Sequence, residues 1–134
     1  MTSTSTPDTI PSLHVGAITR KTLALFAGAS GDHNPMHIDS DAAKAAGLDD
    51  VFAHGMLTMA YMGRAVTDSF PQSQLRELSG RFTAITPVGA EPVVNLEATD
   101  RSEVDGETRL HLSITVVLGD GTQTMRGSAV VALP

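Results

Sequence analysis

The second half of the chain constrains the fold most, because apolar and polar residues alternate strictly along it. In the clearest segment Leu110, Leu112, Ile114 and Val116 would share one side of an extended backbone, and the polar residues between them would share the other. This period of two predicts strands with one buried face. We expect four such strands, at residues 75–85, 92–104, 108–118 and 123–133.

Two Asp-Gly pairs mark the places where the last three of these strands reverse. Asp105-Gly106 and Asp120-Gly121 lie between consecutive strand segments, and Asp-Gly is a strong signal for a two-residue hairpin turn. The three strands are therefore expected to form an antiparallel meander.

Helices are predicted before the strands. Thr19 is a suitable N-cap for a helix over 20–29, and Ser40 for a short helix over 41–46. We expect the first helix to bury Leu23, Leu25, Phe26 and Ala29. The segment 55–69 is apolar on most sides, which is typical of a buried helix. Helices followed by an antiparallel sheet indicate an α+β fold in which the sheet wraps one buried helix.

Composition limits the class of protein. A chain of 134 residues predicts one domain, over 12–134, after a flexible Ser/Thr/Pro-rich tail over 1–11. The chain has no cysteine, which excludes disulfides and a thiolate nucleophile. A net charge of −6 argues against a nucleic-acid partner. Without a long apolar run or a targeting segment, we expect a soluble cytoplasmic protein that does not enter a membrane.

The residues best suited to chemistry gather at 30–57. Eight consecutive positions carry five ionisable or amide side chains, namely Asp32, His33, Asn34, His37 and Asp39. Pro35 stiffens this loop, which would hold the carboxylate of Asp32 and the imidazole of His37 in a constant relation. A carboxylate and an imidazole held together are typical of acid–base catalysis.

A second part of this segment could bind an oxyanion. His54-Gly55 stands at the start of the long predicted helix, where backbone N–H groups have no partner within the helix. An acid, a base and an oxyanion donor are the groups needed to add or remove water beside a thioester carbonyl.

Other interpretations of the segment remain open. Asp, Asn and Pro are common in loops without function. The Asp and His side chains could instead bind a metal, although they lack a recognised ligand spacing. Ser30 could be a nucleophile, but no Gly-x-Ser-x-Gly elbow surrounds it. His14 and His111 are not part of a cluster of polar residues in the sequence and are interpreted as surface residues.

Two motifs in this segment resemble a known family. Gly31-Asp32-His33-Asn34-Pro35-Met36-His37 followed by Ala53-His54-Gly55-Met56-Leu57 resembles the signature of the MaoC-like (R)-specific enoyl-CoA hydratases. The resemblance extends from about Leu13 to the C-terminus, and the chain is similar to single-domain mycobacterial-type β-hydroxyacyl-thioester dehydratase subunits. It implies the hot-dog fold, a sheet wrapped around a long central helix.

The resemblance also implies roles for individual residues. Asp32 and His37 match the family's catalytic pair, and Gly55 matches the glycine whose N–H faces the thioester oxygen. Asn34, His54 and Met56 are the expected substrate-binding residues beside them. Gly63 stands where some members have a serine, so one hydrogen bond to the site is expected to be missing.

The implied activity is hydration of trans-2-enoyl thioesters to 3-hydroxyacyl thioesters, or the reverse dehydration, with no metal or other cofactor. The substrate would be attached to CoA or to an acyl carrier protein, and the chain would pair with itself or with another hot-dog subunit. Candidate cations for the CoA phosphates are Arg64, Arg81 and Arg126. A hot-dog thioesterase and a non-catalytic acyl-binding subunit are the alternatives.

Overall fold

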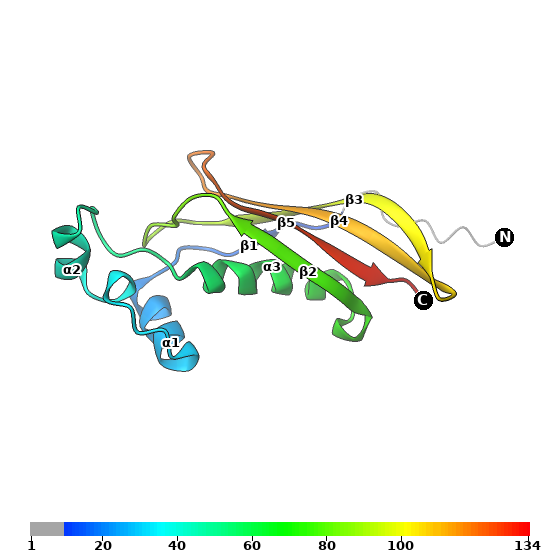
Figure 1. The fold of residues 1–134 in the computed structure, drawn as a ribbon. Coiled ribbons are helices and arrows are strands. Elements are labelled where there is room, and N and C mark those ends of the chain that lie inside the picture. Colours follow the sequence, from blue (N-terminus) through cyan, green and yellow to red (C-terminus); the bar gives the residue numbers. More distant parts are fainter. Residues whose placement is uncertain (1–9) are drawn as a thin grey trace.

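The computed structural model describes residues 10–134, and the first nine residues of the predicted tail lie outside the described range. Within this range one antiparallel sheet lies against a long helix, with two shorter helices beyond that helix's N-terminal end (Figure 1). The helical elements are α1 (Arg20–Ser30), η1 (Pro35–His37), α2 (Ser40–Ala45), α3 (Gly55–Ser69) and η2 (Gln72–Gln74). The strands are β1 (Leu13–His14), β2 (Leu75–Phe82), β3 (Val93–Val104), β4 (Glu107–Val117) and β5 (Gln123–Ala132).

The five strands are ordered β1-β3-β4-β5-β2, with antiparallel neighbours throughout. The predicted meander is confirmed for β3, β4 and β5, whereas β2 crosses over to pair with β5. Asp105 and Gly106 form the expected two-residue turn, with φ angles of 53° and 78° that fit a type I′ hairpin. The turn around Asp120-Gly121 is longer than predicted, because the ladder closes at Val117 and Gln123.

The main core lies between α3 and the sheet. The predicted alternation in β4 is confirmed, since Leu110, Leu112, Ile114 and Val116 are all buried against the helix side. Met62 of α3 is fully buried, and it can approach the sheet closely because position 127 is a glycine. A Cβ atom at Gly127 would overlap the carbonyl oxygen of Ser79 and lie 2.8 Å from the Cε atom of Met62.

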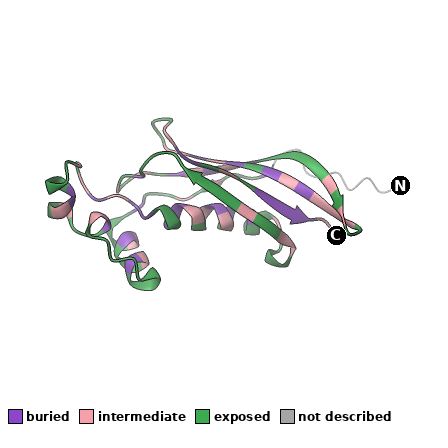
Figure 2. Cartoon of the chain, viewed as in Figure 1, coloured by how far each residue is buried: buried purple, intermediate pink, exposed green. Residues whose placement is uncertain are grey.

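Helix α3 has the predicted bounds, but only one of its sides is buried. Five of its residues face the interior: Leu57, Thr58, Met62, Ala65 and Val66. On another side Met56 is 61% exposed and Ala60 is exposed, and the sheet curves over the helix without enclosing it (Figures 1 and 2). The expectation of a buried helix is thus confirmed for one side of α3 and wrong for the other within a single chain.

Helix α1 is also buried less than the sequence predicts. Thr19 is its N-cap as predicted, and its hydroxyl oxygen accepts a hydrogen bond from the backbone N–H of Thr22. Leu23 is buried, but Leu25 is 63% exposed and Ala29 is exposed, so both were predicted wrongly. The helix contacts the rest of the molecule along one narrow side, which contains Leu23 and Ala27.

The cap of α2 is displaced by one residue from the prediction. Asp39 occupies the N-cap, and its Oδ1 atom accepts hydrogen bonds from the backbone N–H groups of Asp41 and Ala42, at 3.0 and 3.2 Å. Ser40 is the first residue of the helix. A carboxylate is the better cap here because it also interacts favourably with the positive end of the helix dipole.

Of the predicted tail, the described part includes Ile10, which is 7% exposed and packs in the main core. Among the residues that the structure describes, no helix is both long and apolar enough to cross a membrane.

Candidate active site

The loop after α1 holds Asp32 through a series of local hydrogen bonds. Gly31 ends the helix in the left-handed conformation, with φ of 77°. The backbone N–H of Asp32 donates to the Ser30 hydroxyl at 3.1 Å, and the N–H of Asn34 donates to Oδ1 of Asp32 at 3.2 Å. Because Oδ1 is engaged by the loop itself, the other carboxylate oxygen, Oδ2, is available to a ligand.

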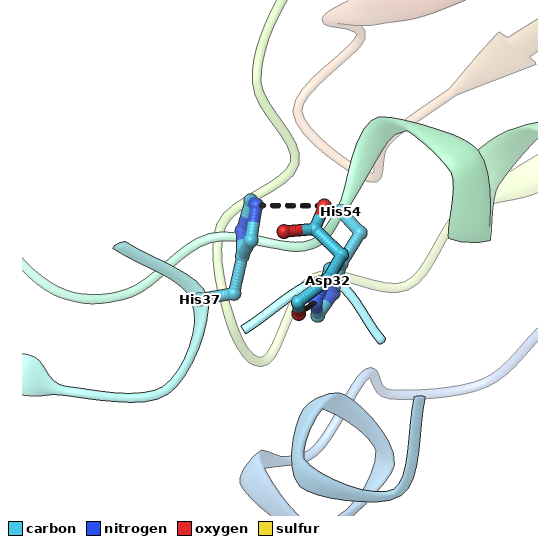
Figure 3. A group of neighbouring side chains, drawn as sticks. All are labelled: Asp32, His37 and His54. Atoms are coloured by element: carbon cyan, nitrogen blue, oxygen red, sulfur yellow. Dashed lines mark hydrogen bonds and ion pairs between the residues drawn. The ribbon is translucent and has the colours of Figure 1, made fainter. Parts of the chain in front are cut away.

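The imidazole of His37 is oriented by the segment before α3. Its Nδ1 atom lies 2.7 Å from the carbonyl oxygen of Phe52, and a carbonyl can only accept, so Nδ1 carries the hydrogen. Neutral His37 therefore has its lone pair on Nε2, which lies 4.0 Å from Oδ2 of Asp32 (Figure 3). The arrangement leaves a proton acceptor facing a carboxylate oxygen.

His54 supports this pair from within the protein. His54 is 1% exposed, its ring stacks on that of His37 with ring centroids 3.9 Å apart, and the Phe26 ring packs against it in a T-shaped arrangement. Its Nε2 atom lies 3.1 Å from the backbone carbonyl oxygen of Asp32, to which it donates. The Nδ1 atom of His54 is buried without a hydrogen-bond partner among the described residues.

The position of the Phe52 carbonyl depends on two contacts with other elements. The backbone N–H of Phe52 donates to the carbonyl of Met36 at 3.2 Å, and that of Ala53 donates to Thr86 at 2.8 Å. Upstream, Arg20 hydrogen-bonds to Asp50, and this guanidinium lowers the pKa of the Asp50 carboxyl to about 2. These contacts hold the segment that orients His37 and leads into α3.

Gly55 is the first residue of α3, so its N–H has no acceptor within the helix. No described residue supplies another acceptor for this N–H. The ring of Phe82 covers the glycine, because a Cβ atom at position 55 would lie 3.0 Å from Cε1 of Phe82. The free N–H is therefore beside an aromatic wall.

A half-open pocket of about 350 Å³ adjoins Gly55. Its lining residues come from the segment before α3, the start of α3, the end of β2 with the loop that follows, and the start of β5: Phe52, Ala53, Gly55, Thr58, Phe82, Thr83, Ala84, Ile85, Thr86 and Thr124. No sequence pattern indicated a role for the threonines or for Phe82, since each is ordinary in its own segment. The pocket is formed by residues far apart in the chain.

The structure brings some of the predicted site residues together and leaves others apart. Asp32, His37 and His54 form one cluster, and Gly55 directly follows His54 in the chain. Asn34 caps η1 by accepting from the N–H of Met36 at 3.1 Å, and Met56 is exposed in the first turn of α3. Arg81 and Arg126, by contrast, are a cross-strand pair beside a polar hollow of the sheet whose lining contains no residue of α3.

The three clustered side chains also form a group that could hold a metal ion, since one ligand atom from each lies within 4.8 Å of the others. Histidine binds a metal through a lone pair in the plane of its ring, at about 2.0–2.1 Å for zinc. The rings of His37 and His54 are stacked with 27° between their planes, so their lone pairs do not converge readily on one ion. His37 and His54 each use one nitrogen on a backbone carbonyl.

Comparison with known proteins identifies the family. The sequence model of the family described as the MaoC-like domain matches residues 3–118 of this chain. The chain belongs to the MaoC-like family. An R-hydratase from Pseudomonas aeruginosa, solved in the unliganded form, is 27% identical with a TM-score of 0.80, covering 94% of this chain and 81% of that chain. An (R)-hydratase from A. caviae, at 22% identity and a TM-score of 0.82 over 97% and 99% of the two chains, shows that the fold is the same. The hot-dog fold implied by the motifs is confirmed.

Sequence relatives of this MaoC-like chain carry dehydratase names. It is 27% identical to a mitochondrial 3-hydroxyacyl-[acyl-carrier-protein] dehydratase of Solanum lycopersicum, covering 77% of this chain and 62% of that protein. It is 33% identical to 3-hydroxyacyl-thioester dehydratase Z of Mycobacterium tuberculosis, covering 54% and 52%. The MaoC-like chain thus spans between half and two thirds of the length of these two relatives.

Proposed function

We propose that this MaoC-like chain hydrates trans-2-enoyl thioesters to 3-hydroxyacyl thioesters with (R) specificity, or catalyses the reverse dehydration. The observation that carries the proposal is Nε2 of His37, which faces Oδ2 of Asp32 at 4.0 Å while Nδ1 is engaged by a backbone carbonyl, next to the N-terminus of α3. Relatives named as dehydratases and R-hydratases support the same reaction class.

In the hydration direction, one water molecule would bind between His37 and Asp32. A separation of 4.0 Å is too long for a direct hydrogen bond, but a water at ordinary hydrogen-bond distance can contact both atoms. His37 accepts one proton as the water oxygen attacks C3 of the enoyl group. The proton taken by His37 is then relayed through Asp32 to C2, so the imidazole returns to its neutral form and one water has been added across the C2–C3 bond.

The negative charge that develops on the thioester oxygen would be stabilised at α3. The free N–H of Gly55 and the positive end of the helix dipole are both available there. Removing one donor of this kind typically costs a factor of about 10²–10³ in turnover. Asn34 would hold the catalytic loop, and Met56 would contact the substrate at the helix start.

The buried position of His54 favours a revised role for this residue. With 1% of its surface exposed and its Nε2 on the Asp32 carbonyl, His54 is better placed to position the pair than to bind substrate. The contact between its ring and that of His37 serves the same purpose.

The first experiment distinguishes hydration from thioester hydrolysis and from acyl binding without turnover. Crotonyl-CoA is mixed with the protein in the presence of a chelator, while the absorbance of the conjugated enoyl thioester and the release of free thiol are recorded together. We expect absorbance to fall without thiol release. Thiol release would identify a thioesterase, and binding without either change would identify a non-catalytic subunit.

The partner we propose is a second hot-dog subunit, either identical or different. β2 is an edge strand in the described sheet, and Phe82 at its end and Ile85 in the loop that follows are 53% and 50% exposed. Solved neighbours include the ChsH1–ChsH2 and HadBC complexes of Mycobacterium tuberculosis. Attachment of the substrate to CoA or to an acyl carrier protein, and a cytoplasmic location, remain predictions.

A further inference from the structure

We propose that Thr124 selects thioesters carrying a neutral hydrogen-bonding group, which its hydroxyl binds in the pocket beside Gly55. The inference rests on the proposed function, because it adds a specificity residue to the same site. It concerns the part of the substrate that extends away from the reacting carbons.

A β-bulge brings Thr124 to the pocket. In the ladder between β4 and β5, Val116 pairs with Met125 and Val117 pairs with Gln123, so Thr124 is an extra residue without a partner in β4. Met125 and Thr124 are consecutive, yet both are buried, at 0% and 2% exposure. In a regular strand one of two consecutive residues would face the opposite side of the sheet. The bulge thus places a polar side chain at a wall of the pocket.

The hydroxyl of Thr124 has no hydrogen-bond partner among the described residues. Threonine could be replaced here by valine, which has the same shape and no polar group, if packing were all that mattered. Leaving a buried hydroxyl unpaired destabilises a protein, so such a group calls for an explanation. Rotation about χ1 moves the hydroxyl to another staggered position, which allows it to face a ligand that enters the pocket.

The pocket restricts the chemistry of that ligand. None of its lining residues is charged, and Phe52, Phe82 and Ile85 supply apolar surface. Thr58 and Thr86 are also buried in its wall, at 3% and 4% exposure. An ionic group would lose its hydration here without finding a counter-charge, whereas a neutral amide, hydroxyl or carbonyl would need only one hydrogen bond.

Two parts of a thioester substrate carry such a group next to an apolar chain. The pantetheine arm of CoA or of an acyl carrier protein contains amides, and an oxygenated acyl chain carries a hydroxyl or carbonyl. Both present the same chemistry to Thr124, and they are distinguished by changing the acyl chain while the CoA is kept.

The test measures binding and does not require turnover. Dissociation constants of hexanoyl-CoA and 6-hydroxyhexanoyl-CoA, neither of which can be hydrated, are determined by calorimetry for the wild type, Thr124→Val and Thr124→Ser. We expect Thr124→Val to weaken binding about fivefold to tenfold, the usual effect of one lost hydrogen bond, and Thr124→Ser to restore it. Weakening with both ligands would identify the amide, and weakening with the hydroxylated ligand alone would identify the acyl chain.

Equal affinities of the wild type and Thr124→Val for each ligand would overturn the proposal. Thermal melts accompany the titrations, and we expect Thr124→Val to melt no lower than the wild type because it removes an unpaired buried hydroxyl. Hydration of crotonyl-CoA by the wild type tests the reaction separately. An inactive wild type with the binding difference intact would reject the proposed reaction and leave the role of Thr124 standing.

Discussion

The Nε2 atom of His37 and the Oδ2 atom of Asp32 face each other across 4.0 Å, although the two side chains have very different surroundings. The side chain of His37 is 8% exposed and that of Asp32 is 52% exposed. The imidazole is thus enclosed by the protein interior, whereas the carboxylate lies on the solvent-exposed side of the pair.

The first prediction concerns this pair. Asp32→Asn keeps the shape of the carboxylate, and His37→Asn keeps an N–H near the position of Nδ1, so both variants should fold. Each removes a group that handles protons, and we expect turnover of crotonyl-CoA to fall at least 100-fold. The double variant should be little worse than the worse single variant, because both groups act on one water. Turnover is measured beside a thermal melt.

His33→Asn is the matched control for that experiment, because His33 lies in the same loop with its side chain exposed. It should retain wild-type turnover. Near-wild-type hydration by His37→Asn with an unchanged melt would reject the mechanism, and an unfolded Asp32→Asn would assign the motif a structural role.

The second prediction concerns His54 as a positioning residue. His54→Gln retains an amide donor for the Asp32 carbonyl, whereas His54→Leu retains bulk and loses the donor. We expect His54→Leu to lower kcat about tenfold with little change in KM, the effect of a lost hydrogen bond that orients the carboxylate. His54→Gln should stay within about threefold of the wild type. A wild-type kcat in His54→Leu would contradict this role.

The third prediction isolates the N–H of Gly55. Gly55→Pro removes this N–H, and proline is tolerated at the first position of a helix. His54, with ψ of 135°, is already outside the α region that a following proline disfavours. We expect kcat to fall by about 10²–10³, as for other oxyanion donors.

Gly55→Ala is the control, since it adds a Cβ atom against Phe82 and keeps the N–H. Its kcat should lie much closer to that of the wild type than to that of Gly55→Pro. Equal losses in the two variants would mean that contact with Phe82, and not the N–H, limits turnover.

The fourth prediction concerns assembly. Sedimentation of the chain at micromolar concentration should reveal a dimer, unless a different hot-dog subunit is required. If the second subunit that pairs at the β2 edge also covers the exposed side of α3, Ala60→Glu should produce monomers, because a carboxylate would be buried in an apolar contact. Ala24→Glu on the exposed surface of α1 is the matched control and should not change the mass. A wild-type monomer, with no dimer formed on adding a hot-dog subunit, would argue against this interface.

The fifth prediction concerns stability against pH. The carboxylate of Glu107 accepts hydrogen bonds from Arg76 and Arg109, which lower its pKa from the ordinary value of 4.5 to about 2. A lowered pKa in the folded state contributes stability above pH 4.5, and this contribution is lost as the pH falls towards 2. The difference in melting temperature between wild type and Glu107→Gln should therefore shrink over that range.

Glu97→Gln provides the comparison, because Glu97 is exposed and forms no ion pair with any described residue. A difference between wild type and Glu107→Gln that stays constant from pH 5 to pH 2 would show that the two arginines do not stabilise the ionised carboxylate.

Local sequence determined the positions of most elements and the segment in which the candidate site residues lie. Helix α3 begins at Gly55 and ends at Ser69 as predicted, and the alternation in β4 correctly assigned its buried side. The stiffness of the loop from Asp32 to His37 could be predicted for the same reason. Its geometry depends on a helix end, a proline and hydrogen bonds between near neighbours. Interactions between residues close in the chain leave a pattern in the chain itself.

The tertiary structure decided the features that depend on distant segments. The Phe52 carbonyl that assigns the proton of His37, the pairing of β2 with β5, and the bulge at Thr124 all join residues well separated in sequence. Exposure of Leu25 and of one side of α3 likewise depends on which surfaces the sheet covers. An apolar side chain can be buried, but only packing against other elements determines whether that side chain is in fact buried.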